Sequence, residues 1–342
     1  MSPPGRLRIA TLNCLNMALP GRRFYGGVEP YRPDEYIAKT QWLAALLDRL
    51  AADFVYVQEV FHEKALRDVV SQSTSGPHAY GLAVPLADDQ NAKPRVGLIW
   101  RTPWQPRIET LTDFPPGCAV TVPERGNYTH YSRPLLLARV AWGPGGATLT
   151  LLNVHLKSRR PEFVAGEIEA DQIAEARAQL RSLIMRAAEA AALRRLVIDL
   201  TPAGSMLVLG GDFNDEPNAV TTQLVADTSW KDDNEGTRDH VLFNTLDVAP
   251  HATPARGRDV AFTILHGGEP ERIDHMFVSE PFVAGRQPQL ARVVAVEIYN
   301  DHLAERHAHA HGLVAGPDLA RIHSDHAAVC TTVELMPAPA SA

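Results

Sequence analysis

Short apolar runs bounded by polar turns recur along the chain and predict buried β-strands. Several of the runs are rich in β-branched and aromatic residues, as is typical of strands. The pattern predicts strands at residues 8–13, 53–58, 96–100, 135–140, 148–153, 206–210, 273–278, 293–298 and 327–333.

Two segments show helical periodicity instead. Pro33, followed by Asp34 and Glu35, is a helix-start signal, and leucines recur after it near helical spacing. A longer helix is predicted from about residue 164 to residue 200, with apolar residues on one face and arginines and glutamates elsewhere. The residues on the apolar face are Ile173, Ala176, Leu180, Leu183, Ile184, Ala187 and Ala191. Strands with helices between some of them predict a layered α/β or α+β fold.

The chain of 342 residues, 45% hydrophobic and 21% charged, has an ordinary globular composition, which argues against long disorder and against a fibre. It shows no repeat and no clear linker, so we expect one domain over residues 1–336, followed by a frayed tail at 337–342. Within that domain, residues 300–323 are rich in histidine. We interpret this segment as a surface insertion that can overhang the active site, and imidazole ligation of a second metal stays open.

The sequence shows no apolar run of the roughly 20 residues that span a bilayer, and no apolar signal core follows Met1. The three cysteines, Cys14, Cys118 and Cys330, lie too far apart in the sequence for a disulfide framework or a CxxC metal-binding motif. We therefore expect buried free thiols and a cytoplasmic location. A net charge of −7 argues against a protein that binds duplex nucleic acid non-specifically through its phosphates, but it does not exclude a nuclease.

Polar residues repeatedly interrupt the ends of the predicted strands. One such residue alone is typical of a turn or a cap, but the repetition offers carboxylates, amides and histidines together. If these strand ends converge, they form an oxygen-rich pocket with two histidines. The residues in question are Asn13, Glu59, His155, Asp212, Asn214, Asp274, Asp325 and His326.

At these positions the chain resembles the endonuclease/exonuclease/phosphatase family, which includes DNase-like nucleases, sphingomyelinases and inositol-polyphosphate phosphatases. The resemblance spans positions 9–330, and its most specific parts are Gly211-Asp212-Phe213-Asn214 and Ser324-Asp325-His326. Other matching segments are 11–13, 58–60, 153–158 and 272–279. The resemblance implies a four-layer α/β sandwich of the DNase-like type, with two packed, mainly antiparallel β-sheets flanked by helices.

The resemblance also implies a metal site. Glu59 corresponds to the main metal carboxylate, with Asp325 and the amide of Asn13 nearby. Oxygen ligation by few protein groups suits Mg²⁺ or Mn²⁺, which keep several waters and take phosphate oxygens as ligands.

The catalytic roles follow from the same resemblance. Asp212 would orient or deprotonate the attacking water, and Asn214 would donate a hydrogen bond to developing charge. His326, held by Asp274, would contact the phosphate or act as the base, and His155 would donate to a phosphate oxygen or the leaving group. The identity of the base stays open, because a nearby cation would lower the pKa of Asp212 and favour His326.

Basic residues form a second group of candidates. We expect Lys157 and Arg133 to bind substrate phosphate, while Arg159 and Arg160 either do the same or form a solvated turn. Asp215 is interpreted as a helix cap.

The sequence therefore predicts a divalent-metal-dependent phosphoester hydrolase. The favoured activity is that of a phosphodiesterase or nuclease, with a phosphoester such as nucleic acid as the substrate. A phosphatase of a small metabolite or lipid headgroup is the alternative, and a catalytically silent phosphate-binding relative is a remote one. A calcineurin-like dinuclear site is disfavoured because the first strand ends in Asn13-Cys14-Leu15 and no Gly-Asn-His segment occurs. The oligomeric state is not predicted.

Overall fold

The computed structural model describes residues 5–25, 27–76, 78–85, 93–143, 146–227, 240–250, 260–286, 288–313 and 315–337. Its strands are β1 (Arg6–Met17), β2 (Phe54–Val60), β3 (Tyr80–Ala83), β4 (Arg95–Arg101), β5 (Arg107–Asp113), β6 (Val120–Val122), β7 (Gly126–Tyr128), β8 (His130–Ala141), β9 (Thr148–His155), β10 (Met206–Asp212), β11 (Phe243–Asn244), β12 (Ile264–His266), β13 (Glu269–Glu271), β14 (Asp274–Val278), β15 (Ala291–Tyr299) and β16 (Ala328–Leu335). Its helices are α1 (Pro33–Leu50), α2 (Glu63–Ser71), α3 (Gln172–Leu200), α4 (Val220–Ala226), α5 (Thr245–Val248), η3 (Glu280–Phe282), α7 (Asp301–Ala310) and α8 (Leu319–Ile322). Of the tail predicted at 337–342, only Pro337 lies in the described part.

The strands build two six-stranded sheets. The first sheet has the order β15-β16-β1-β2-β4-β3, and the second has the order β11-β14-β10-β9-β8-β5. One pair in each sheet is parallel, β1 with β2 and β9 with β10, while the other neighbours are antiparallel. The predicted pair of mainly antiparallel sheets is therefore confirmed.

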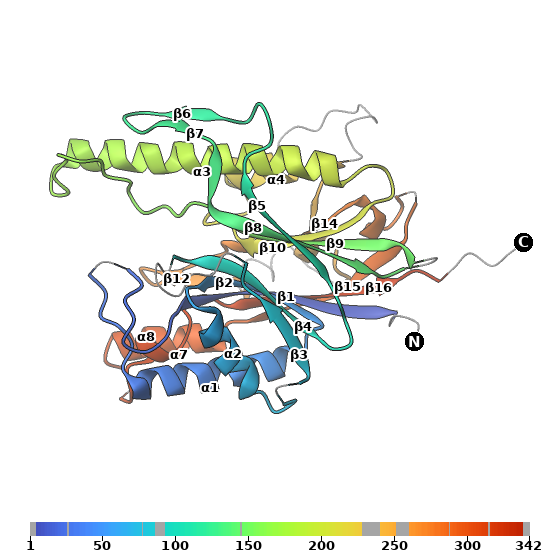
Figure 1. Cartoon of the computed structure of the whole chain (residues 1–342), viewed down its shortest axis with the longest axis horizontal. Coiled ribbons are helices and arrows are strands. Elements are labelled where there is room, and N and C mark those ends of the chain that lie inside the picture. Colours follow the sequence, from blue (N-terminus) through green and yellow to red (C-terminus); the bar gives the residue numbers. More distant parts are fainter. Residues whose placement is uncertain are drawn as a thin grey trace, which may run out of the picture.

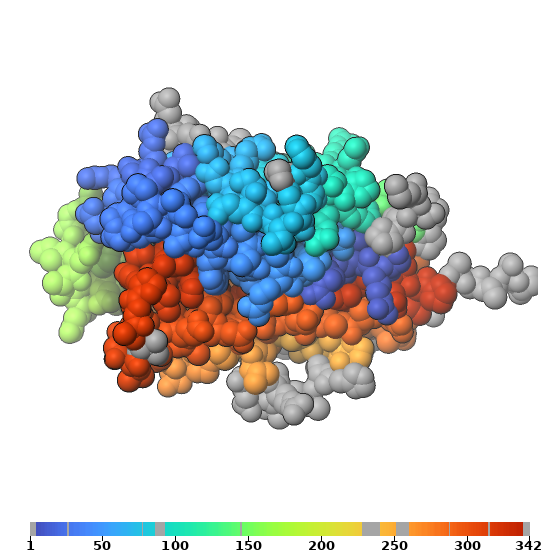
Figure 2. Space-filling view, turned by 90° about the horizontal axis from the view of Figure 1, so that it is seen from below, coloured from blue at the N-terminus to red at the C-terminus, as the bar shows by residue number. Residues whose placement is uncertain are grey.

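The two sheets stack face to face, and helices cover their outer faces (Figure 1). Helices α1, α2, α7 and α8 lie outside the first sheet, and α3 and α4 lie outside the second. From below, the N-terminal and C-terminal parts of the chain lie side by side (Figure 2), as the pairing of β1 with β16 requires. The arrangement is the expected four-layer α/β sandwich.

The core lies in three layers because both faces of each sheet are covered. On β2, Phe54 and Tyr56 point into the core between the sheets, while Val55 and Val57 point into the core under α1. Side chains alternate between the faces of a strand, so a strand buried on both faces has a continuous apolar sequence. This explains why the central strands are visible in the sequence as unbroken apolar runs.

Helix α3 starts later than predicted, at Gln172 rather than near residue 164. The side chain of Asp171 accepts a hydrogen bond from the backbone amide of Ile173 and caps the helix. Upstream, Gly166 has a left-handed φ of 89°, which is incompatible with a continuous α-helix.

The apolar face identified in the sequence of α3 points mainly toward solvent. Ile173, Leu180 and Leu183 are 70%, 51% and 47% exposed. The opposite face is buried and includes Arg181, which pairs with Glu124 and Glu167. An apolar stripe normally faces the core, but here the buried face combines ion pairs with other apolar residues, among them Met185, Leu193 and Val197.

The histidine-rich segment 300–323 forms α7 and α8 between β15 and β16. Its His302 is buried and packs against Trp42 of α1, with ring centroids 4.9 Å apart. The segment is therefore built into the helical layer outside the first sheet.

Cys14 and Cys330 are buried free thiols, as expected, whereas Cys118 is partly exposed. None of the helices within the described ranges is long and apolar enough to cross a membrane.

Candidate active site

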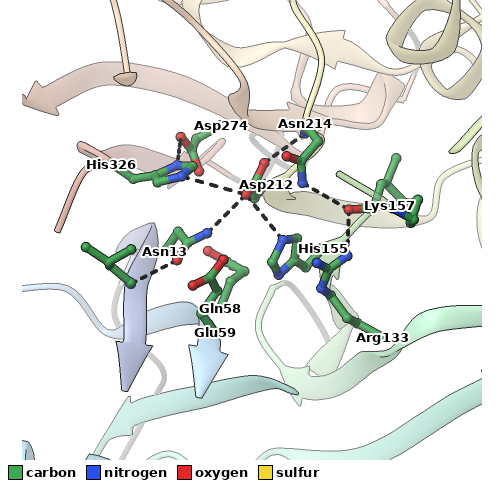
Figure 3. A network of polar contacts seen from close by, with 12 residues as sticks. Asn13, Gln58, Glu59, Arg133, His155, Lys157, Asp212, Asn214, Asp274 and His326 are labelled. Carbon is green, nitrogen blue, oxygen red and sulfur yellow. Dashed lines mark hydrogen bonds and ion pairs between the residues drawn. The ribbon is translucent and has the colours of Figure 1, made fainter. Parts of the chain in front are cut away.

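The predicted strand-end residues other than Asp325 meet at one end of the two sheets (Figure 3), and Oδ1 of Asp325 lies 3.9 Å from Nε2 of His326. Asp212 ends β10, where it is in register with His155 on parallel β9 and with Asp274 on antiparallel β14. From the other sheet, the amide Nδ2 of Asn13 donates to Asp212 Oδ2 at 3.0 Å. The sandwich thus places side chains that are about 200 residues apart in hydrogen-bond contact.

Close packing of β10 on β9 requires glycine just before Asp212. Gly211 has a φ of 145°, and a Cβ atom there would lie 1.9 Å from the carbonyl oxygen of Val154. Only a residue without a side chain fits this contact.

Unusual backbone conformations surround the site. Leu15, Asn16, Glu59 and Asn214 all have positive φ angles, between 49° and 58°. The register between β1 and β2 also shifts between Asn13 and Met17, beside Glu59. Left-handed conformations of non-glycine residues are costly and cluster at functional sites. Here they place Glu59, whose Oε2 accepts a hydrogen bond from the Asn16 amide at 3.0 Å, on the wall of the pocket.

Asp212 is the most connected side chain of the site. Besides the bond from Asn13, its Oδ1 accepts the backbone amide of Asn214 at 2.8 Å. Nε2 of His155 lies 3.4 Å from Asp212 Oδ2, and Nε2 of His326 lies 4.0 Å from it. Burial raises the pKa of Asp212, and the nearby His326 partly offsets this effect.

His326 forms a dyad with Asp274, whose Oδ2 lies 2.8 Å from His326 Nδ1. Burial by itself disfavours the imidazolium, but the charges of Asp274 and Asp212 outweigh it and raise the pKa of His326. Ser324 fixes the loop, because its Oγ accepts the His326 amide at 3.0 Å and donates to the Asn13 carbonyl at 2.6 Å.

His155 is buried, and its surroundings favour the neutral imidazole. Burial lowers its pKa, and the positive charges of Arg133 and His326 lower it further. A neutral histidine carries one N–H, so it can donate one hydrogen bond to a phosphate oxygen.

Of the four basic candidates, Arg133, Lys157 and Arg160 line the same pocket of about 510 Å³, whereas Arg159 does not and pairs with Asp215 and Glu271. Arg133 donates from Nη1 to the Leu156 carbonyl at 3.1 Å, and its buried Nε has no hydrogen-bond partner. Lys157 is largely buried, and its Nζ lies 3.2 Å from Glu162. The side-chain amide of Asn214 donates to the Leu156 carbonyl at 3.0 Å, which fixes its position beside Asp212.

Of the three expected metal residues, only Asp325 has a side-chain oxygen that is buried without a hydrogen-bond partner. The Oδ1 atom of Asn13 accepts the Leu15 amide and Oε2 of Glu59 accepts the Asn16 amide, each at 3.0 Å. Asp325 Oδ1 and Asn16 Oδ1 are buried and have no hydrogen-bond partner. Carboxylate and amide oxygens of this kind are ligands that a hard divalent cation prefers. Asp212, Asp274 and His326 form a second candidate group, with ligand atoms within 4.8 Å of one another. Two of its members are already joined in the His326–Asp274 dyad.

Some functional contacts were not anticipated from the sequence. Gln58 of β2 donates to Asn153 Oδ1 at 2.7 Å and ties the sheets together beneath the site. Glu189 of α3 accepts the backbone amides of Ser132 and Lys157 and thereby joins the two segments that contain Arg133 and Lys157. Gln58 lies within a matched motif and could have been selected, whereas a glutamate in the middle of a long helix gives no such signal.

Asp215 does not cap a helix. It accepts a hydrogen bond from Thr221 Oγ1 at 2.7 Å and pairs with Arg186 and Arg159, whereas α4 begins after Ala219 without a side-chain cap. The buried Arg186 of α3 thus holds the Asp215 carboxylate in an ion pair.

Comparisons with known proteins agree with this geometry. Residues 10–295 match the family model of the Endonuclease/Exonuclease/phosphatase family. A search of curated proteins gave no match.

Similar folds occur among solved structures. The human Nocturnin catalytic domain with bound sulfate anion is 13% identical, with a TM-score of 0.56 over 98% of this chain and 97% of that chain. Humanized D. rerio TDP2 is 15% identical, with a TM-score of 0.54 over 97% of this chain and 100% of that chain. An endonuclease/exonuclease/phosphatase family protein from Bacteroides thetaiotaomicron is 14% identical, with a TM-score of 0.52 over 96% of this chain and 94% of that chain.

At these low identities the solved structures show a similar fold, whereas the match to the family model shows that the chain is a member of the family. The match covers most of the chain, including Asn13, Glu59, His155, Asp212 and Asp274. The chain belongs to the endonuclease/exonuclease/phosphatase family, whose members are metal-dependent phosphoester hydrolases.

Proposed function

We propose that this protein is a divalent-metal-dependent phosphodiesterase that hydrolyses a P–O bond, with nucleic acid as its first candidate substrate. One observation carries the proposal: Asp212 lies between the Asn13 amide, the His155 ring and the His326–Asp274 dyad at the base of an open pocket. Proton acceptor, hydrogen-bond donors and space for a phosphate thus occur together.

Each side chain has a distinct task in this proposal. Asp212, oriented by the Asn13 side-chain amide and the Asn214 backbone amide, positions the attacking water and can accept its proton. Asp274 holds Nδ1 of His326, so Nε2 is left to face the phosphate. His155 donates to a non-bridging oxygen as charge develops there.

Glu59 and Asp325, with Asn13 nearby, are the residues proposed to hold Mg²⁺ or Mn²⁺. When bound, such a cation polarises the phosphoryl group and offsets the charge of the leaving oxygen. The buried Asp325 Oδ1, which lacks a hydrogen-bond donor, supports this placement.

We also propose that residues 1–336 form one domain and that the protein is cytoplasmic. The three-layered core, shared by strands from both halves of the chain, supports a single domain. The three unpaired cysteines support a reducing compartment.

The function is tested with metal-stripped protein to which Mg²⁺, Mn²⁺, Ca²⁺ or Zn²⁺ is returned. Bis-p-nitrophenyl phosphate, p-nitrophenyl phosphate and supercoiled plasmid serve as substrates, and Asp212→Asn is measured beside wild type. We expect metal-dependent cleavage of the diesters and at least a roughly 100-fold lower kcat in the variant, the scale of a lost acid–base group.

Glu169→Gln is the matched control, because this exposed carboxylate lies outside the pocket. It should retain wild-type activity. Hydrolysis of the monoester alone would assign the protein to the phosphatases instead. Wild-type turnover in Asp212→Asn with an unchanged melting temperature would remove Asp212 from the mechanism.

A further inference from the structure

The proposed reaction leaves unused a buried cation of α1. Lys39 is 0% exposed, and its Nζ has no hydrogen-bond partner in the described part of the chain. Ammonium groups are almost never fully buried unless they are paired, because an isolated charge loses its hydration without compensation. The burial of Lys39 therefore needs a reason other than the stability of α1.

Contacts of α1 place Lys39 beside the segment that carries Asp325. Helix α8 precedes this segment and lies next to α1 (Figure 1). Trp42 is one turn after Lys39 on the same side of the helix, and its ring stacks on that of His323 with centroids 4.8 Å apart. His323 is two residues before Asp325. The side of α1 that carries Lys39 is thus packed against the segment that leads to Asp325.

Tyr31 connects Lys39 with the end of β1 as well. Nζ of Lys39 lies 5.6 Å from the centroid of the Tyr31 ring. The Tyr31 hydroxyl donates to the Leu15 carbonyl at 3.2 Å, and the Leu15 amide donates to Asn13 Oδ1 at 3.0 Å. Lys39 therefore packs near both chain segments, the one with Asn13 and the one with Asp325.

The charges of two proposed metal residues act on Lys39. Burial lowers the pKa of Lys39 to about 8, whereas Cys14, Asp325 and Glu59 raise it and Arg306 adds to the lowering. The ammonium form still predominates at pH 7. Because Nζ forms no hydrogen bond with either carboxylate, neither of them uses an oxygen atom for Lys39. The site thus contains a nearby positive charge that leaves its ligand atoms available.

We propose that Lys39 acts on the metal site through its charge: the buried ammonium near Glu59 and Asp325 weakens the binding of the divalent cation to the free protein. The inference rests on the proposed metal-dependent function and adds to it a residue that is not a ligand. Two positive charges repel each other strongly in surroundings of low dielectric constant, where water does not screen them. The affinity for the metal is then a balance between the carboxylates and Lys39.

The test titrates metal-stripped protein with Mn²⁺ and measures free Mn²⁺ by electron paramagnetic resonance. Lys39→Met keeps the length of the side chain and removes its charge. It should bind Mn²⁺ at least roughly fivefold more tightly than wild type at low ionic strength, because the repulsion is lost. Removal of a merely structural lysine would instead loosen the site and weaken binding, so the direction of the change separates the two roles.

Two further variants define what is measured. Glu59→Gln should weaken the same binding, which would show that the ion observed is the one held by Glu59. Lys64→Met removes a lysine of α2 whose side chain is 63% exposed, and it should bind Mn²⁺ as wild type does.

Unchanged or weaker Mn²⁺ binding in Lys39→Met would overturn the inference. Lys39→Gln is measured beside it with the same expectation, and loss of the fold in both variants would show that Lys39 serves packing alone. Absence of Mn²⁺ binding in wild type would contradict the metal assignment together with the inference. Mn²⁺ binding without cleavage of any diester would contradict only the proposed phosphodiesterase, and the titrations of wild type and Lys39→Met would still decide the inference.

Discussion

At the scale of single residues, the site depends on a carboxylate held by both sheets. Asn13 comes from the first sheet, while Asp212 and the dyad partner Asp274 come from the second. Burial raises the pKa of Asp212, which makes this carboxylate a better proton acceptor than an exposed aspartate. Any change in the separation of the sheets therefore acts directly on the catalytic geometry.

Glu59→Gln tests the metal assignment at this scale. Loss of the carboxylate charge should weaken cation binding before it affects the fold, because the side chain lines the open pocket. We expect the Mg²⁺ concentration for half-maximal activity to rise at least roughly tenfold, since even outer-shell changes at metal sites have effects of this size. Metal titration of the diester activity measures it.

Glu169→Gln serves again as the control and should show the wild-type Mg²⁺ requirement. Activity that persists in EDTA would show that the metal assignment itself is wrong.

At the scale of elements, α3 buries a face that combines charged and apolar residues, while the apolar stripe identified in its sequence is largely exposed. The buried face of this 29-residue helix carries Arg181, Arg186 and Glu189, each with a defined partner. Their contacts join the segments after β7 and β9 to the helix. The helix thus supports the basic wall of the pocket while part of its apolar surface stays in water.

Two leucines of α3 allow a direct test of this orientation. Leu193 is fully buried, whereas Leu180 is 51% exposed. Leu193→Ala should lower the free energy of unfolding by about 2–5 kcal/mol through a cavity in the core. Leu180→Ala should change it by less than about 0.5 kcal/mol, as is usual at the surface. Urea denaturation of both variants checks the prediction, and equal losses would place the apolar stripe in the core after all.

At the scale of the whole molecule, the layers are tied together near the site. His302 of α7 donates from Nε2 to the His326 carbonyl at 3.0 Å, which links the outer helical layer to the loop that precedes β16. Tyr56 likewise donates to the Val208 carbonyl at 2.9 Å, from one sheet to the other. These contacts couple the packing of the layers to the position of the catalytic dyad.

His302 should make stability depend on pH. Burial lowers its pKa to about 4, while the ordinary value is 6.5. Between these pH values the unfolded chain binds more protons than the folded one, so His302 costs stability as pH falls from about 6.5 to about 4. We therefore expect the difference between the free energies of unfolding of wild type and of His302→Gln to decrease as the pH falls from about 6.5 to about 4.

The comparison uses urea denaturation at each pH. His266→Gln, which replaces an exposed histidine of β12, should give a difference from wild type that does not change in this way. A constant difference for His302→Gln would show that His302 does not remain neutral in the fold.

Much of the fold and the catalytic set follows from the sequence. Central strands buried on both faces leave continuous apolar runs, and the chemical groups at their ends stand out as polar interruptions. Asn13, Asp212 and His326 were selected on this basis, and the structure brings them together. The short strands β3, β6 and β11 leave no such pattern, because two to four residues are too few to show a periodicity.

Only the tertiary structure decided the orientation of α3 and the composition of the pocket walls. Hydrophobic periodicity identifies a helix, but contacts with distant segments, such as the ion pairs of Arg181 with Glu124 and Glu167 and the packing of Leu193 in the core, show which face is buried. The sequence likewise marked Arg133 and Arg160 as phosphate candidates but not Arg125, which lines the same pocket. Local pattern determines elements and their chemical groups, whereas contacts between residues far apart in the chain determine which of those groups act together.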